Sequence, residues 1–386
     1  MAKNKMGFGT RAIHAGQKPD AESGAIMTPI YQTSTFVQTY PGEHKGYEYS
    51  RTENPTRKAL EENIASLELA DKAYCFASGM AAVDAALKLL KQGDEVIATQ
   101  NIYGGTYRLF FQQYEQFGLR FKFISMDDLA NLEEAIGERT KMLWLETPSN
   151  PTLKIIDLKA AAEISKKHGI IMAVDNTFAS PYLQNPLALG ADLVMHSVSK
   201  YLAGHSDVIM GALATNSETL ANQLYEIQKN SGVIPGPQDC FLVLRGIKTL
   251  HLRMQRHCEN AAQVAAYLKQ HPKVDTVYWP GFDSHQGHQV AKTQMKDFGG
   301  MVSFELKNAK QESAFKVMSK LEVFTIAQSL GGVESMCAHP ASMSHASVPR
   351  AEREEQGILD STIRLSVGIE EVNDLLTDLE SALEFA

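Results

Sequence analysis

The sequence predicts an α/β protein, and two observations indicate this fold class. Between residues 58 and 245, short apolar runs alternate with helix-like stretches, which is typical of βαβ units and a mostly parallel sheet. After Gly246 one long helical stretch is followed by shorter strands and a closing amphipathic segment, which predicts a smaller α+β domain. We therefore expect a large domain at 58–245 and a C-terminal domain at 246–386.

Residues 1–57 are expected to form an irregular arm. Proline and glycine are frequent there and periodicity is weak, yet side chains such as Ile30, Phe36 and Tyr40 are too apolar for a free tail. We expect this arm to pack on a large surface, such as a second subunit.

The remaining elements follow from apolar patterning. Strands are expected at 95–98, 121–124, 142–145, 170–174, 193–195 and 208–214, with helices at 81–90 and 158–168 between them. In the C-terminal part, helices are expected at 249–270 and 372–385 and strands at 276–279, 301–306 and 362–367.

Composition excludes several classes of protein. The 386 residues include 37 Lys plus Arg and 45 Asp plus Glu, so the net charge of −8 gives no general attraction for nucleic acid or anionic lipid. The four cysteines lack zinc-site or CxxC spacing, which indicates free thiols in a reducing compartment. No apolar signal core and no run approaching ~18 apolar residues is present, so we expect a cytoplasmic protein outside the membrane.

Lys200 is the first candidate for chemistry, in the segment Ser197-Val198-Ser199-Lys200 at the end of a predicted strand. An amine on a rigid mount is what pyridoxal 5′-phosphate (PLP) chemistry requires, because the lysine bonds to the cofactor aldehyde and later transfers protons. The hydroxyls of Ser197 and Ser199 could bind a phosphate. An exposed loop lysine is the alternative, and the motif alone does not decide between them.

Asp175 ends another predicted strand, 25 residues before Lys200. Such a carboxylate is either a helix cap or a functional group, which in a PLP site would keep the pyridine nitrogen protonated. One crossover and its strand fit between the two residues, which favours the cofactor role.

Three further motifs are ambiguous singly. Ser78-Gly79-Met80 is either a tight turn or a helix start that receives phosphate. Tyr103 is either a core tyrosine or a ring stacked on a flat cofactor. Arg364, between apolar residues, is either an outward-facing arginine or a partner for a substrate carboxylate.

Other chemistries have less support. The chain has neither GxGxxG nor a Walker motif, which disfavours dinucleotide and ATP binding. Ser197 and Lys200 match the SxxK of penicillin-binding enzymes, but the companion motifs SDN and KTG and the GxSxG elbow are absent. His285 and His288 lie in a glycine-rich turn and lack a nearby carboxylate triad, so a surface turn is expected there and no metal site.

Taken together, these motifs make the sequence resemble the trans-sulfuration (Cys/Met metabolism) family of PLP-dependent enzymes over essentially the whole chain. The matching motifs are Tyr47–Thr52, Asn54–Thr56, Ala77–Gly79, Tyr103–Thr106, Glu146–Pro151, Val174–Phe178, Ser199–Tyr201, Gly204–Asp207, Ser329–Gly332 and Arg364–Gly368. The resemblance implies the aspartate aminotransferase-like architecture (fold-type I), with a mostly parallel seven-stranded sheet in the large domain, and a homotetramer built from two dimers.

The resemblance also implies site roles. It gives the cofactor bond to Lys200, the ring-nitrogen contact to Asp175 and ring stacking to Tyr103. A further set is implied to bind phosphate or substrate: Ser78, Gly79, Met80, Ser197 and Ser199 for the phosphate, Tyr49 and Arg51 for the phosphate of the neighbouring subunit, and Arg364, Asn150, Ser329 and Gln328 for the substrate.

The activity implied first is γ-elimination on cystathionine, which gives cysteine, 2-oxobutanoate and ammonia, with Lys200 moving protons and Tyr103 assisting the leaving group. Replacement of the acyl group of an O-acylhomoserine by cysteine is the alternative. Gln328 stands where the γ-acting members commonly carry Glu, which leaves recognition of the distal amino group open. Gly105 in place of Cys argues against methionine γ-lyase activity, and Leu330 in place of Trp argues against a dedicated β-lyase. A PLP-binding protein without catalysis is the remaining alternative.

Overall fold

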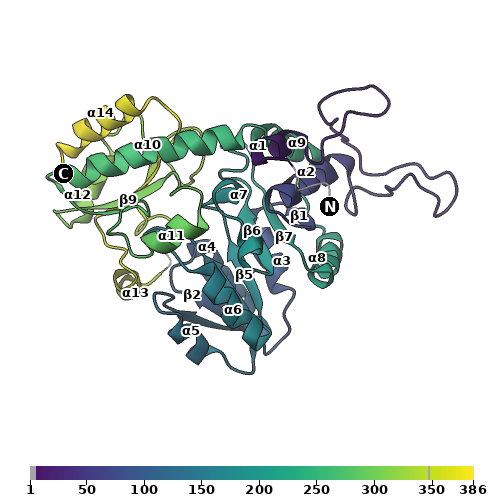
Figure 1. Cartoon of the computed structure of the whole chain (residues 1–386), viewed down its shortest axis with the longest axis horizontal. Coiled ribbons are helices and arrows are strands. Elements are labelled where there is room, and N and C mark those ends of the chain that lie inside the picture. Colours follow the sequence, from purple (N-terminus) through teal and green to yellow (C-terminus); the bar gives the residue numbers. More distant parts are fainter. Residues whose placement is uncertain (1–5, 347) are drawn as a thin grey trace.

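The computed structural model describes residues 6–346 and 348–386, so residues 1–5 of the predicted arm lie outside the described residues. Two β-sheets organise this part of the chain (Figure 1). The larger has seven strands in the order β1-β7-β6-β5-β4-β2-β3, and the smaller has five in the order β10-β11-β12-β9-β8. The strands are β1 (Lys72–Phe76), β2 (Glu95–Thr99), β3 (Arg120–Ile124), β4 (Thr140–Glu146), β5 (Ile171–Asp175), β6 (Leu193–Ser197), β7 (Gly211–Thr215), β8 (Val274–Tyr278), β9 (Met301–Leu306), β10 (Thr325–Ile326), β11 (Met336–Ala338) and β12 (Thr362–Ser366).

The large sheet is mostly parallel, as predicted. Neighbouring strands from β3 to β6 pair in parallel, whereas β7 runs antiparallel to both β6 and β1. Parallel neighbours end at the same edge of a sheet, so the carboxyl ends of β4, β5 and β6 meet at one edge.

Helices connect and cover the strands. They are α1 (Phe8–His14), α2 (Pro55–Leu67), α3 (Gly79–Leu87), α4 (Gly104–Leu109), α5 (Ala130–Ala135), α6 (Leu158–His168), α7 (Ser180–Leu183), α8 (Glu218–Ser231), α9 (Pro237–Ile247), α10 (Leu250–Gln270), α11 (His288–Gln294), α12 (Gln311–Met318), α13 (Arg350–Glu355) and α14 (Val372–Leu383), with short π or 3-10 turns at Phe110–Tyr114, Glu115–Phe117 and Pro186–Leu189.

The sequence fixes helix ends by side-chain caps. At the start of α2, Asn54 accepts hydrogen bonds from the backbone N–H groups of Thr56 and Arg57, and Pro55 occupies the first turn, where its missing N–H is harmless. At α6, Asp157 caps the first turn and Gly169 ends the helix in the left-handed conformation.

Both faces of the large sheet are buried. Along β4, Met142 and Trp144 point to the face that α3 covers, while Leu143 and Leu145 point to the face that α6 covers. This two-sided burial explains why the sequence of these strands reads as continuous apolar runs. A separate core lies between the small sheet and its helices, with α10 and α14 packed together.

The arm expected to be irregular contains one helix, α1, which packs against α2 and α10, and the chain between α1 and α2 projects from the body (Figure 1). In this segment the side chains Ile26, Val37 and Tyr40 are 86%, 93% and 69% exposed, so no described residue covers them. Exposed apolar side chains gathered on one segment are typical of a surface that binds another protein.

Most expected elements are present. The predicted helix 158–168 and strand 301–306 match α6 and β9, and the helix predicted at 249–270 differs from α10 by one residue. The strand expected at 208–214 is wrong in its start, because β7 begins at Gly211, and the short strands β1, β10 and β11 were not predicted. The division at residues 57 and 245 stays a prediction. All four cysteines are buried and free, and no helix among the described residues is long and apolar enough to cross a membrane.

Candidate active site

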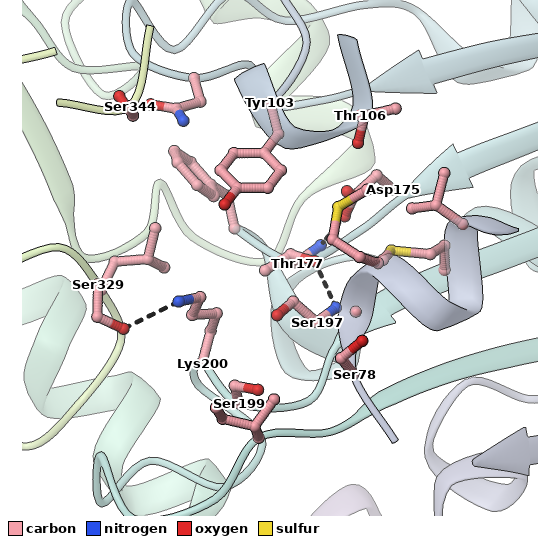
Figure 2. Close-up of a pocket in the computed structure, with 18 of the residues that line it drawn as sticks. Ser78, Tyr103, Thr106, Asp175, Thr177, Ser197, Ser199, Lys200, Ser329 and Ser344 are labelled. Atoms are coloured by element: carbon pink, nitrogen blue, oxygen red, sulfur yellow. Dashed lines mark hydrogen bonds between the residues drawn. The ribbon is translucent and has the colours of Figure 1, made fainter. Parts of the chain in front are cut away.

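A cavity of about 400 Å³ lies at the edge where the carboxyl ends of β4, β5 and β6 meet. The N-terminus of α3 forms one side, and loops and strands of the smaller sheet, including Ser329 and Arg364, form the other. Figure 2 shows side chains from these separate elements pointing into the same space. Ligands bind at this edge in open α/β sheets.

Lys200 lies at the end of β6, on the turn that follows Ser197 (Figure 2). Its Nζ donates a hydrogen bond of 2.9 Å to the Oγ of Ser329. Burial and the positive charge of Arg364 lower the pKa of Lys200 to about 8. At pH 7 about one-tenth of this amine is therefore uncharged, far more than at the ordinary pKa of 10.5, and the uncharged form is the nucleophile and proton acceptor.

The first turn of α3 lies close to Ser197, and both line the cavity. Ser78 caps this helix through its Oγ, which accepts from the N–H of Ala81 at 3.0 Å. A Cβ atom at Gly79 would lie 3.0 Å from the Oγ of Ser197, so glycine allows this close approach without a shift of the serine side chain. Because first-turn N–H groups have no partner within the helix, Gly79 and Met80 can direct theirs to an anion.

Ser199 also lines the cavity. Its hydroxyl accepts from the N–H of Met210 at 2.9 Å and donates to the carbonyl oxygen of the same residue at 3.2 Å. The predicted phosphate contact from Ser199 therefore requires its hydroxyl hydrogen to leave the Met210 carbonyl.

Two buried carboxyl groups lie side by side at the ends of β4 and β5. Glu146 pairs in register with Asp175. Burial and the neighbouring Asp175 raise the pKa of Glu146 well above its usual value. Burial also raises the pKa of Asp175, although hydrogen bonds from Thr177 and the charge of His196 act in the opposite direction.

Tyr103 holds its ring over the cavity, opposite Ser197 and Lys200 (Figure 2). Its backbone N–H donates to the Oε2 of Glu146 at 2.7 Å. A Cβ atom at Gly105 would lie 2.3 Å from the Cε1 of Tyr103, so this ring position depends on glycine at 105. The position of the Tyr103 ring, which is predicted to stack on the cofactor, thus depends on Glu146 and Gly105.

Arg364 is buried on β12 and points into the cavity rather than outward from an edge strand. It donates to the Oδ1 of Asn150 at 2.9 Å and to the carbonyl oxygen of Ser329 at 3.0 Å. Its Nε finds no hydrogen-bond partner among the described residues. A buried cation with an unused donor suits an anionic ligand such as a carboxylate. Gln328, which is exposed, lines the mouth of the same cavity.

The structure does not bring Tyr49 and Arg51 to this cavity. They line a separate hollow with Ile234. The guanidinium of Arg51 lies 5.6 Å from the centre of the Tyr49 ring and donates to the carbonyl oxygen of Lys229 at 2.6 Å. Their predicted contact, which belongs to a neighbouring subunit, stays a prediction.

Sequence reasoning missed several residues of the site. Glu146 lies in the matching motif Glu146–Pro151, but the sequence analysis assigned no role to it. Its position as an acid at the end of a predicted strand, like that of Asp175, could have identified it. Thr177 was missed as well; its Oγ1 accepts from the N–H of Ser197 at 2.8 Å and so ties β5 to β6. Thr106 and Ser344 also line the cavity, and the sequence offered no signal for Ser344 because its loop comes from the C-terminal part.

The residues present fit PLP, the cofactor that the resemblance implies. The cavity offers a helix N-terminus and hydroxyls for a phosphate, an amine of lowered pKa for an aldehyde, and a buried carboxyl for a ring nitrogen. The approach of Ser197 to Gly79 and the unused Nε of Arg364 are features that a bound anion would explain. Among the described residues, no group of three or more His, Cys, Asp or Glu could hold a metal ion.

The sequence and the fold are similar to those of several known proteins. A "Cystathionine beta-lyase" of Coxiella burnetii is 54% identical over 97% of this chain and 97% of its own length. A "Cystathionine gamma-lyase" of Dictyostelium discoideum is 50% identical over 99% and 98%. The crystal structure of a cystathionine gamma synthase from Xanthomonas oryzae pv. oryzae superimposes with a TM-score of 0.96 and 40% identity, covering 98% of each chain. Residues 9–384 match the model of the Cys/Met metabolism PLP-dependent enzyme family, and the chain therefore belongs to that family, as a PLP-dependent enzyme of trans-sulfuration with fold-type I architecture.

Proposed function

We propose that this enzyme catalyses γ-elimination on cystathionine, consuming water and yielding cysteine, 2-oxobutanoate and ammonia. The observation that carries the proposal is the amine of Lys200, whose pKa is lowered to about 8 and which lies in one cavity with the Tyr103 hydroxyl and the Arg364 guanidinium. This reaction needs a base, an acid for the departing sulfur, and an anchor for the substrate carboxylate.

Six residues of the cavity would hold the cofactor. Lys200 would bond to the cofactor, and Asp175 would contact its ring nitrogen. Gly79, Met80 and Ser197 would receive its phosphate at the start of α3, where the helix dipole favours an anion. Tyr103 would cover the ring.

Each step of the chemistry is assigned to a side chain. Arg364 binds the substrate α-carboxylate, with Asn150 and Ser329 fixing the guanidinium. When bound, the cofactor supplies an electron-withdrawing ring that stabilises negative charge at the substrate Cα. Lys200 would remove the proton from Cα and deliver it to the electron-withdrawing system that the cofactor supplies, which frees its amine to take a second proton from Cβ. The hydroxyl of Tyr103 would donate a proton to the departing sulfur.

We also propose that the working unit is a homotetramer built from two dimers. The exposed apolar arm offers a surface for a second copy, and Tyr49 and Arg51 lie outside this chain's own cavity. In the proposed dimer they complete the phosphate site of the neighbouring subunit. Mixing inactive K200A and R51A subunits then tests the arrangement, because only shared sites regain activity in the mixed dimer.

A product assay separates the proposed reaction from its alternatives. Supplied with cystathionine alone, the enzyme is expected to release 2-oxobutanoate and cysteine. Pyruvate with homocysteine would instead identify β-elimination, the activity named for the Coxiella relative. Cystathionine made from an O-acylhomoserine and cysteine, without oxo acid from cystathionine, would identify γ-replacement. The K200A variant is the control for each arm, and release of 2-oxobutanoate from methionine alone would contradict the substrate choice.

A further inference from the structure

A cluster of buried polar side chains lies on the face of the large sheet opposite the cavity lining. Glu68 follows α2, His196 lies on β6, and Asn176 follows β5; all three are essentially inaccessible to solvent. The Nε2 of His196 bonds to the Oε1 of Glu68. Asn176 donates from its Nδ2 to the same oxygen at 3.0 Å, and Asn185 donates to the other carboxylate oxygen at 3.4 Å.

Stability alone does not account for this cluster. An acid and a base buried together lose their hydration, and replacing such a pair by apolar residues is often neutral or stabilising. The position of the pair within the sheet is therefore informative.

Two members of the cluster, Asn176 and His196, are each one residue away from a cavity residue. Asn176 follows Asp175, and His196 precedes Ser197; side chains alternate along strands, so Asp175 and Ser197 point into the cavity while His196 points to the opposite face. Hydrogen bonds hold the end of β5 in place. The Asn176 N–H donates to the carbonyl oxygen of Met195 on β6 at 2.9 Å, and the Thr177 N–H donates to the Oδ1 of Asp175 at 3.0 Å.

Charge connects the pair to Asp175 as well. Burial raises the pKa of Asp175, and a positive charge on His196 lowers it. Glu146, the other acid at this edge, lies beside Asp175 in register and disfavours a second negative charge. Glu68 contacts the imidazole of His196 and accepts a hydrogen bond from Asn176, the residue next to Asp175, so it holds both beside that carboxyl group.

We propose that Glu68 and His196 are positioning residues that act through Asp175, holding its carboxylate charged and oriented for the ring nitrogen of the cofactor. The inference rests on the contact assigned to Asp175 under the proposed function. Neither Glu68 nor His196 touches the cavity, so neither is a catalytic residue.

The test compares two cofactors on the apoenzyme. One is PLP, and the other is its 1-deaza analogue, in which a C–H group replaces the ring nitrogen. Dissociation constants for both are measured by titration for the wild type and the variants H196Q, E68Q and D175N. Each amide variant removes charge while keeping hydrogen-bonding atoms. D378N is the matched control, because Asp378 is also a buried carboxylate, accepts three backbone N–H bonds and lies in the C-terminal part.

The expected result is selective. H196Q and E68Q should each weaken PLP binding about tenfold, the effect of one pKa unit at the contacting carboxyl, and leave binding of the deaza analogue unchanged. The double variant should lose no more than either single variant, because each removes the same charge effect. D378N should change neither constant selectively.

Two outcomes would overturn the proposal. Equal weakening of both cofactors by H196Q and E68Q would mean that the pair only supports the fold, and unchanged binding of both would mean that it does not act on the site. D175N separates these failures from a wrong assignment of Asp175. If D175N discriminates between the cofactors and the other two variants do not, only the present inference fails; if D175N does not discriminate, the assignment of Asp175 fails with it.

Discussion

Replacing Lys200 by Met in the apoenzyme is expected to stabilise the folded protein at neutral pH. Burial first, and Arg364 second, lower the pKa of Lys200 from 10.5 to about 8, so the folded state resists holding this proton. At pH 7 the difference corresponds to about 3 kcal/mol of lost stability. Methionine also gives up the hydrogen bond to Ser329, worth about 1 kcal/mol, which leaves a net gain of about 2 kcal/mol.

The pH dependence of this stability difference follows from the number of protons that the folded and unfolded states bind. Below pH 8 both states hold the proton and the penalty is complete; between pH 8 and 10.5 the unfolded chain binds more protons, so wild-type stability rises relative to the variant. Above 10.5 the penalty is gone. Urea unfolding of both apoproteins from pH 7 to 10.5 measures this, with the exposed Lys292→Met as control. A stability difference between wild type and K200M that stays constant across this range would refute the assigned environment of Lys200.

Further predictions concern Arg364, the ring of Tyr103 and the buried acid Glu146. Arg364→Ala should lower kcat/KM for cystathionine roughly a hundredfold, about 3 kcal/mol, because a buried partner of the substrate carboxylate is lost; an equal loss with a substrate lacking that carboxylate would contradict this. Gly105→Ala should displace the Tyr103 ring, because its Cβ would lie 2.3 Å from that ring, and should lower kcat about tenfold or more; Gly137→Ala, with nothing within 4 Å of its Cβ, is the control. Glu146→Gln should keep more activity at neutral pH than Glu146→Ala, because burial and the neighbouring Asp175 raise the pKa of the native acid and so favour its neutral form, which glutamine mimics. Loss of activity in the Gln variant at pH 7, measured as steady-state kcat, would show that the charge is required.

Most strands of the large sheet could be predicted from the sequence because both of their faces are buried. Strands such as β4, covered on both faces, read as apolar runs and were found from the sequence. β1 was missed because its place depends on antiparallel pairing with β7, which lies more than a hundred residues later in the chain. Such long-range pairing leaves no local period to read.

The site was predictable where chemistry coincides with a strand end. Lys200 and Asp175 follow apolar runs and carry distinctive groups, so their positions drew attention. Glu146 has the same setting, but its contacts with Tyr103 and Asp175 exist only once β4 and β5 pair. The roles of Tyr49 and Arg51 depend on a second chain and therefore stay predictions.

The central claim is that the amine of Lys200 carries the cofactor. Borohydride reduction of the purified holoenzyme, followed by proteolysis and peptide mapping, tests it directly. The account predicts a single pyridoxyl-labelled peptide that contains Ser199-Lys200-Tyr201, with no label in the K200A variant. A label on another lysine, or full incorporation by K200A, would contradict it.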